Sequence, residues 1–320
     1  MIVEVAVIGT GVMGRNHARI LSTLPGVHLA AIVDADPERA RSLAVEYGCS
    51  WGTDLGDVAQ RVDAVVLAVP THLHHELAMR AIEYSLHVLV EKPIAETIEQ
   101  AREIVEAAAD RNRILAVGHV ERFNPACSDL KQYVSQPRFL QLHRLSPYAG
   151  RIQEGVIRDL MIHDVDLLLW LADAEPVDVT ARSIAPRSET EDLAVATITF
   201  DNGVIAQLTA ARIAQRKVRT IDIIEDESLV HVDLLQQSIN IFRQTKVEHV
   251  VEGTVRLRQS SVSEVPFLSR RGEPLALELD DFVNAVATGG TPFVTGAQGL
   301  AALELSERIL AASNASLASA

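Results

Sequence analysis

The first 118 residues alternate between short apolar runs rich in β-branched residues and longer stretches with an amphipathic pattern. The short runs predict buried strands, and the stretches between them predict helices. Predicted strands cover residues 3–8, 27–33, 64–69 and 114–117 and a run that ends at Lys92, and predicted helices cover 15–24, 37–47, 76–84 and 98–110. Strands that alternate with helices in this way predict an α/β fold with a doubly wound parallel sheet.

After Gly118 the pattern changes to runs in which apolar and polar residues alternate. This alternation predicts a large, mainly antiparallel open sheet with two differently used faces. Asp201-Asn202-Gly203 lies between two of the runs and predicts a hairpin turn. The predicted strands are 138–145, 177–184, 193–200, 204–213, 218–224 and 229–234, followed by helices over 275–287 and 296–312, the latter with Thr295 as its N-cap.

A glycine motif follows the first predicted strand and opens the first predicted helix. It reads Gly9-Thr10-Gly11-Val12-Met13-Gly14, the spacing of a dinucleotide-binding turn. In such a turn the first glycine allows the tight bend, the second lets a pyrophosphate approach the backbone, and the third lets helix and strand pack closely. The free N–H groups at the helix N-terminus then attract the phosphates.

Asp34 ends the second predicted strand, where a dinucleotide-binding fold carries the carboxylate that binds the ribose hydroxyls. The same carboxylate repels a 2′-phosphate, so the sequence favours NAD over NADP as cofactor. NADP remains an alternative cofactor, because the Arg39 side chain could reach a 2′-phosphate.

With 320 residues the chain is long enough for two domains. We predict a Rossmann domain over residues 1–118 and an α+β domain for substrate binding and oligomerisation over 119–320, whose C-terminal helices could pack back on the first domain.

Two further strand ends carry candidate chemistry. In open α/β sheets ligands bind outside the carboxyl ends of the strands. Glu91-Lys92-Pro93 ends one predicted strand, which would direct the Lys92 amine into the cofactor crevice; an ordinary surface lysine is the alternative. Pro70, Thr71 and His74 follow another strand, near the nicotinamide end of a bound dinucleotide, and Thr71 is expected to cap the next helix. The neighbouring histidines suggest a metal cluster, but no Cys, Asp or Glu completes a first shell, so no metal is predicted.

In the second half, Asp159 and His163 are four residues apart on a predicted helix and share one face, which Asp166 and Trp170 extend. A carboxylate one turn from an imidazole can orient the ring and stabilise its protonated form, which is a general-base arrangement. A structural pair on a buried face is the alternative. A metal site of His163, Asp164 and Asp166 fits less well, because helix neighbours point in different directions.

Net charge, cysteine content and hydropathy exclude several classes of function. The net charge is −14, from 43 acidic and 29 basic residues without a Lys/Arg run, which argues against a nucleic-acid partner. Cys49 and Cys127 lack a CxxC spacing, so neither a disulfide framework nor a zinc site is expected. Neither a basic leader nor an apolar run of membrane-spanning length is present, so a soluble, cytoplasmic protein is expected.

These motifs together resemble the Gfo/Idh/MocA oxidoreductase family, over residues 3 to about 313. The resemblance rests on the glycine motif, Asp34, Glu91-Lys92-Pro93, and Asp159 with His163 on a helix after Glu154-Gly155. It implies a Rossmann domain joined to an α+β domain whose open sheet forms homodimers or homotetramers. It also implies hydride transfer between a sugar-type hydroxyl and NAD, with Lys92 bonding the reacting oxygen, His163 removing the proton and Asp159 holding His163. The cofactor residues would be Gly9, Gly11, Val12, Met13, Gly14, Asp34, Pro70, Thr71, His74, Glu91 and Lys92.

Residues 118–125 and 144–151 look like the branch that oxidises UDP-N-acetylglucosamine at the sugar 3-hydroxyl. Arg122, Arg144 and Arg151 could meet a nucleotide diphosphate through forked donors. The expected substrate residues are Lys92, Arg122, Tyr148, Arg151 and His163. A free sugar or cyclitol such as myo-inositol is the alternative substrate, and a non-catalytic dinucleotide-binding regulator is the alternative of another class. Lys92, Asp159 and His163 favour an enzyme, because a sensor has no chemical need for them.

Overall fold

The computed structural model describes residues 2–148, 154–251 and 254–317. Contacts divide the chain into two compact units. The first consists of Met1–Phe123 and Gly272–Glu304, and the second of Asn124–Arg271 and Leu305–Ala320. Within the described ranges, no helix combines the length and the apolar character needed to cross a membrane.

The first unit is built on a six-stranded parallel sheet in the order β3-β2-β1-β4-β5-β6. The strands are β1 (Val3–Ile8), β2 (Val27–Val33), β3 (Ser50–Gly52), β4 (Ala64–Leu67), β5 (His87–Glu91) and β6 (Leu115–Gly118). The chain reverses its direction across the sheet between β1 and β4, so the sheet is doubly wound as predicted. The short β3 was not predicted, because its three residues are too few to show a pattern.

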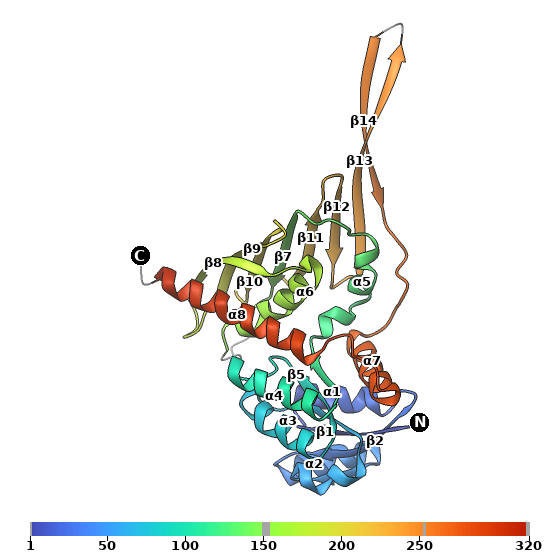
Figure 1. The fold of residues 1–320 in the computed structure, drawn as a ribbon, viewed down its shortest axis with the longest axis vertical. Helices are drawn as coiled ribbons and strands as arrows, with labels where there is room; N and C mark the ends of the chain where they lie inside the picture. Colours follow the sequence, from blue (N-terminus) through green and yellow to red (C-terminus); the bar gives the residue numbers. More distant parts are fainter. Residues whose placement is uncertain (1, 149–153, 252–253, 318–320) are drawn as a thin grey trace. The chain divides into compact units, whose positions relative to one another are not determined.

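Helices cover both faces of this sheet (Figure 1). Apolar side chains of α1 (Val12–Leu21), α2 (Pro37–Tyr47) and α7 (Pro274–Thr288) pack in one cluster, and those of α3 (His74–Glu83) and α4 (Ile98–Asp110) pack in the other. Thr295 caps α8 (Gly296–Leu317) as predicted. Its Oγ1 accepts a hydrogen bond from Gln298 N at 3.3 Å, and Gln298 Oε1 accepts one from Thr295 N at 3.0 Å.

The second unit contains an eight-stranded sheet in the order β14-β13-β12-β11-β7-β10-β9-β8. All neighbours are antiparallel except β7 and β10, which agrees with the predicted mainly antiparallel sheet. Asp201-Asn202-Gly203 connects β9 to β10, with Gly203 at φ +84°, so the predicted hairpin is confirmed. The strands are β7 (Phe139–Leu145), β8 (Pro176–Ile184), β9 (Leu193–Phe200), β10 (Ile205–Ala211), β11 (Val218–Ile224), β12 (Ser228–Asp233), β13 (Ser238–Val251) and β14 (Thr254–Glu264).

The sequence analysis predicted no strands beyond residue 234, yet β13 and β14 are the longest strands of the described sheet. They pair with each other from Ile241 and Glu264 to Val251 and Thr254. Figure 1 shows this hairpin extending well past the end of β12. Apolar and polar residues alternate only briefly in this segment, as at Val255-Arg256-Leu257-Arg258, and polar runs such as Arg243-Gln244-Thr245-Lys246 separate these stretches.

The helices of the second unit are α5 (Pro125–Ser128), α6 (Ile162–Ala172) and the later part of α8. A π-helical turn, Ile157–Met161, leads directly into α6. The N–H of Ile162 bonds to the carbonyl of Ile157, five residues back. The helix predicted around Asp159 and His163 is therefore present, but its first turn is wound more widely than a regular α-helix.

Candidate cofactor and catalytic sites

The first unit contains a cavity of about 650 Å³ at the carboxyl ends of β1, β2, β4 and β5. This is the edge where a doubly wound sheet binds its ligand. Of the predicted cofactor residues, its lining includes Gly9, Gly11, Val12, Met13, Asp34, Pro70, Glu91 and Lys92. Gly14, Thr71 and His74 are not among the lining residues.

The glycine motif has the geometry of a dinucleotide cradle. Gly9 has φ +97°, a conformation that favours glycine. A Cβ on Gly14 would lie 1.9 Å from the carbonyl oxygen of Gly9, so α1 and the turn can pack this closely only without a side chain. A Cβ on Gly11 would meet no atom within 4 Å, which leaves open space over the N-terminus of α1. The motif therefore fits a bound pyrophosphate.

Asp34 is held at the end of β2 by donors from two directions. Its Oδ2 accepts hydrogen bonds from Thr10 N at 2.8 Å and Thr10 Oγ1 at 2.6 Å, and its Oδ1 accepts one from Asp36 N at 2.9 Å. Burial alone would raise the pKa of Asp34, but these bonds and the charge of Arg39 outweigh it and lower the pKa. The carboxylate thus stays ionised and fits ribose hydroxyls. Arg39 also lines the cavity, and its Nε lies 3.3 Å from Asp36 Oδ2.

The Glu91-Lys92-Pro93 turn follows β5 directly, and its Lys92–Pro93 peptide bond is cis. Glu91 Oε1 lies 2.8 Å from Nε2 of His17 on α1, and Glu91 Oε2 accepts a long bond of 3.3 Å from the N–H of Lys92. Burial would raise the pKa of Glu91, but the His17 bond and the charges of His17 and Lys92 lower it. The sequence analysis missed His17. Its only signal was a polar residue one turn after Gly14 on a helix that must pack against the sheet.

The segment after β4 differs from the prediction in one respect. Thr71–Leu73 forms a 3-10 turn, and α3 begins at His74 with Leu73 at its N-cap and no side-chain cap. The predicted cap by Thr71 is therefore wrong, because the extra turn separates it from the helix.

His74 is 1% exposed, and its ring nitrogens contact two backbone carbonyls: Nδ1 lies 2.8 Å from Pro93 O and Nε2 lies 3.0 Å from Val69 O. The next residue, His75, pairs with Glu103 at 2.7 Å. Across the described residues, no three candidate metal ligands gather.

In the second unit, Asp159 lies in the π-helical turn and His163 in the first turn of α6, and both are half-buried. Asp164, the residue after His163, is buried and accepts two hydrogen bonds from Arg144 on β7, at 3.0 Å from Nε and 2.7 Å from Nη2. Arg144 was expected to meet a diphosphate. The structure buries its guanidinium against Asp164 of α6.

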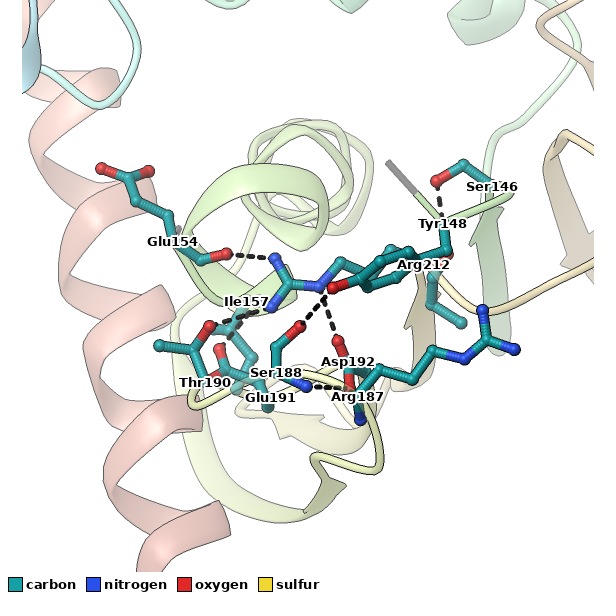
Figure 2. Close-up of polar contacts among 11 residues, drawn as sticks. Ser146, Tyr148, Glu154, Ile157, Arg187, Ser188, Thr190, Glu191, Asp192 and Arg212 are labelled. Atoms are coloured by element: carbon teal, nitrogen blue, oxygen red, sulfur yellow. Dashed lines mark hydrogen bonds and ion pairs between the residues drawn. The ribbon is translucent and has the colours of Figure 1, made fainter. Parts of the chain in front are cut away.

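A second buried ion pair holds the segment that precedes the π-helical turn (Figure 2). Arg212 is 2% exposed and donates to three oxygens: Asp192 Oδ1 at 2.8 Å, the carbonyl of Glu154 at 2.5 Å, and Thr190 Oγ1 at 2.9 Å. Asp192 Oδ2 accepts backbone bonds from Arg187 and Ser188. Burial would raise the pKa of Asp192, but the bonds from Arg212, Ser188 and Arg187 lower it to about 2.

Glu191 continues this network toward the π-helical turn that leads into α6. Its carbonyl accepts from Val156 N at 3.1 Å, and its Oε1 accepts from Ile157 N at 3.2 Å. A Cβ on Gly155 would lie 2.0 Å from the same Oε1, so a larger residue there would displace the Glu191 side chain from its bond to Ile157. The loop 187–192 therefore fixes the start of the turn that carries Asp159. The sequence analysis missed Arg212 and Asp192, because residues 20 apart show no pairing signal in a single sequence.

The predicted substrate residues have different environments. Tyr148 is 40% exposed, its ring lies 5.4 Å from the guanidinium of Arg187, and its hydroxyl is 3.4 Å from Ser188 Oγ. Arg122 is 2% exposed, with its guanidinium 5.8 Å from the ring of Phe293. Arg151 lies outside the described residues.

Comparison with known proteins gives consistent relatives. An oxidoreductase family model, the NAD-binding Rossmann fold of GFO/IDH/MocA proteins, matches residues 3–119, and the GFO/IDH/MocA C-terminal domain matches residues 133–229. UDP-N-acetylglucosamine 3-dehydrogenase of Acidithiobacillus ferrooxidans is 36% identical over 295 residues, which cover 92% of this chain and 91% of that protein. The NAD(+)-dependent scyllo-inositol 2-dehydrogenase of Bacillus subtilis is 27% identical, over 95% and 92% of the two chains.

A solved structure of the Acidithiobacillus ferrooxidans enzyme superposes with a TM-score of 0.88 and 33% identity, covering 98% of this chain and 99% of that one. The match extends through both units, including the residues beyond the second family model.

Proposed function

This chain belongs to the Gfo/Idh/MocA oxidoreductase family, and from that premise we propose that it is an NAD-dependent dehydrogenase of a nucleotide sugar, with the 3-hydroxyl of UDP-N-acetylglucosamine as the preferred reacting group. The observation that carries the substrate choice is the 36% identity to a UDP-N-acetylglucosamine 3-dehydrogenase over nearly the whole of both proteins. The match to an inositol dehydrogenase of similar coverage has 27% identity.

The proposed reaction removes a hydride from the sugar carbon and a proton from its hydroxyl, which leaves a ketone. NAD supplies the hydride acceptor when it is bound in the cavity of the first unit. Lys92 lines that cavity, and its amine would donate a hydrogen bond to the reacting oxygen and stabilise negative charge as it develops there. His163 would accept the hydroxyl proton, and Asp159 would hold the imidazole and stabilise its protonated form.

Cofactor preference follows from Asp34. Its carboxylate remains ionised at neutral pH and already binds Thr10, so a 2′-phosphate beside it would meet an uncompensated negative charge. Arg39 is paired with Asp36, which offsets part of its charge. The proposal therefore gives NAD a lower KM than NADP.

We also propose Tyr148, Arg151 and Arg122 as contacts to the nucleotide part of the substrate. Tyr148 offers an exposed ring beside a cation, which suits a base or a diphosphate. Arg122 would have to leave its contact with Phe293 to reach a ligand.

The substrate proposal is tested by adding UDP-N-acetylglucosamine, free N-acetylglucosamine, myo-inositol and scyllo-inositol separately to the NAD-loaded protein. Binding is followed by calorimetry and turnover by the absorbance of reduced nicotinamide. Turnover with the UDP-sugar and much weaker turnover with the others is expected. Turnover with an inositol but not with the UDP-sugar would establish the cyclitol alternative. Tight NAD binding without turnover on any of a wide sugar panel would favour the non-catalytic regulator.

A homodimer or homotetramer through the large sheet is proposed as the working assembly. Along β9 the buried residues Ala196, Ile198 and Phe200 alternate with half-exposed ones, so one sheet face is packed and the other is partly open. Three strands of this sheet, β10, β11 and β13, leave large apolar side chains exposed, at Ile205, Ile224 and Phe242. Light scattering across a dilution series measures the state, and a monomer at micromolar concentration would contradict this proposal.

A further inference from the structure

We propose that two buried histidines, His17 on α1 and His74 on α3, position the Lys92 amine by fixing the residues on either side of it. Neither ring would touch the substrate, so both are positioning residues. The inference rests on the proposed function, in which Lys92 acts on the reacting oxygen.

His17 fixes the residue before Lys92. Its side chain is fully buried, and Nε2 lies 2.8 Å from Glu91 Oε1. Among the described residues, Nδ1 of this ring is buried without a hydrogen-bond partner. A proton on Nε2 suits the site, because the ring then donates it to the carboxylate. The buried imidazole of His17 thus holds the Glu91 side chain in one place.

The Glu91 carboxylate is confined from further directions. Its second oxygen accepts the N–H of Lys92 at 3.3 Å, and a Cβ on Gly118 of β6 would lie only 3.0 Å from that oxygen. The carboxylate therefore connects α1 to the backbone of Lys92 itself. Since α1 begins at the glycine motif, the same helix that would receive the cofactor phosphates also sets the start of the catalytic turn.

His74 fixes the residue after Lys92. It is 1% exposed, and its Nδ1 lies 2.8 Å from the carbonyl oxygen of Pro93. Its other nitrogen lies 3.0 Å from the carbonyl of Val69, at the end of β4. Both contacts join α3 and the β4 loop to the turn, so a movement of either would shift Pro93.

These anchors matter because the lysine side chain is long and flexible. The place of its amine depends on where the backbone of residue 92 begins, and a misplacement of about 1 Å can cost about 100-fold in rate. Loss of an anchor should therefore lower kcat strongly and leave NAD binding nearly unchanged.

The test compares His17→Leu with His17→Gln, and His74→Leu with His74→Asn. The amide of each conservative variant can replace the relevant N–H donor, whereas leucine cannot. His75→Leu is the matched control, because His75 adjoins His74 in sequence and its Nε2 lies 2.7 Å from the exposed Glu103 of α4. Melting temperature, NAD affinity, kcat and KM are measured for each.

We expect kcat to fall about 10- to 100-fold in both leucine variants, with NAD affinity within about threefold of the original protein. The glutamine and asparagine variants should recover most of the lost kcat, and His75→Leu should behave normally. Unchanged kcat in folded His17→Leu and His74→Leu would overturn the inference. Equal loss in the leucine and amide variants would also overturn it, because packing alone would then explain the effect.

A replacement variant and a chemical modification assay complete the test. If His17→Leu does not fold, His17→Ser replaces it, since the smaller side chain leaves room for water beside Glu91. Acetylation of Lys92, followed by peptide mass spectrometry in the folded proteins, needs no substrate and should speed up when an anchor is lost. Lys92→Ala distinguishes failure of the proposed function from failure of the positioning role. Normal turnover of Lys92→Ala contradicts the proposed function. Lost turnover of Lys92→Ala, together with normal turnover of His17→Leu and His74→Leu, contradicts only the positioning role.

Discussion

Arg144 and Asp164 form an almost completely buried ion pair, with Arg144 Nη2 2.7 Å from Asp164 Oδ1 and both side chains at most 4% exposed. Asp164 directly follows His163, so this pair ties the first turn of α6 to the centre of the large sheet. The arginine serves packing and orientation of α6 in this structure.

We therefore expect Arg144→Met to lower the free energy of unfolding by about 3–5 kcal/mol, because it leaves the Asp164 charge buried without its cation. The double variant Arg144→Met, Asp164→Leu should recover much of that loss. Urea unfolding measures both. A folded Arg144→Lys protein of normal stability with a raised KM for the UDP-sugar would instead support the diphosphate role that the sequence suggested.

The difference between expectation and structure at Arg144 has a general physical cause. Features set by local pattern were predictable: the glycine motif, Asp34 at the end of β2, the parallel sheet and the Thr295 cap all follow from residues close in sequence. The partner of an arginine is set by the tertiary fold. A single sequence therefore could not distinguish an Arg144 that pairs with Asp164 from one that waits for a ligand.

Several contacts in the candidate site also join residues that lie far apart in the sequence. His17 contacts Glu91 across 74 residues, and His74 contacts Pro93 across 19, so neither pairing leaves a periodic signal. The start of the π-helical turn at Ile157–Met161 is bonded to Glu191, and the buried Arg212 bonds to Glu154 just before it, contacts that helical spacing does not reveal. In hairpin β13–β14, polar runs such as Arg243-Gln244-Thr245-Lys246 divide the alternation into stretches too short to predict a strand.

Two glycines of the cofactor motif should respond differently to alanine. Gly14→Ala should destabilise the first unit by about 1–3 kcal/mol or more, because the new Cβ meets the rigid carbonyl of Gly9. Gly11→Ala should leave stability nearly unchanged, since Gly11 has φ −64° and open space around it. It should weaken NAD binding at least about tenfold if the pyrophosphate approaches this backbone. Thermal melts and NAD calorimetry provide the measurements, and unaltered NAD affinity in Gly11→Ala would contradict the proposed cradle.

Asp192 predicts a pH dependence of stability. Its pKa is lowered to about 2 in the folded chain, whereas an unfolded aspartate titrates near about 3.9. A carboxyl group with a lowered folded pKa contributes its full stability above the unfolded pKa and loses it as the pH falls through the folded pKa. The Asp192 contribution should therefore be complete at about pH 5 and fade toward pH 2.

Asp192→Asn should be less stable than the original protein at pH 5, and the difference in unfolding free energy should shrink as the pH falls. Asp178→Asn, at an exposed position on β8, is the matched control and should show little difference at any pH. A gap between Asp192→Asn and the original protein that stays constant down to pH 2 would show that the ionised carboxylate is not what stabilises the loop.

The most direct test of the proposed chemistry is the turnover of Lys92→Ala with NAD and UDP-N-acetylglucosamine, measured beside NAD affinity by calorimetry. We predict a loss of kcat of about 100-fold or more, because the amine that stabilises the developing charge is gone, with NAD affinity nearly unchanged. Near-normal turnover in this variant would contradict the assignment of Lys92 as a catalytic residue and the mechanism built on it.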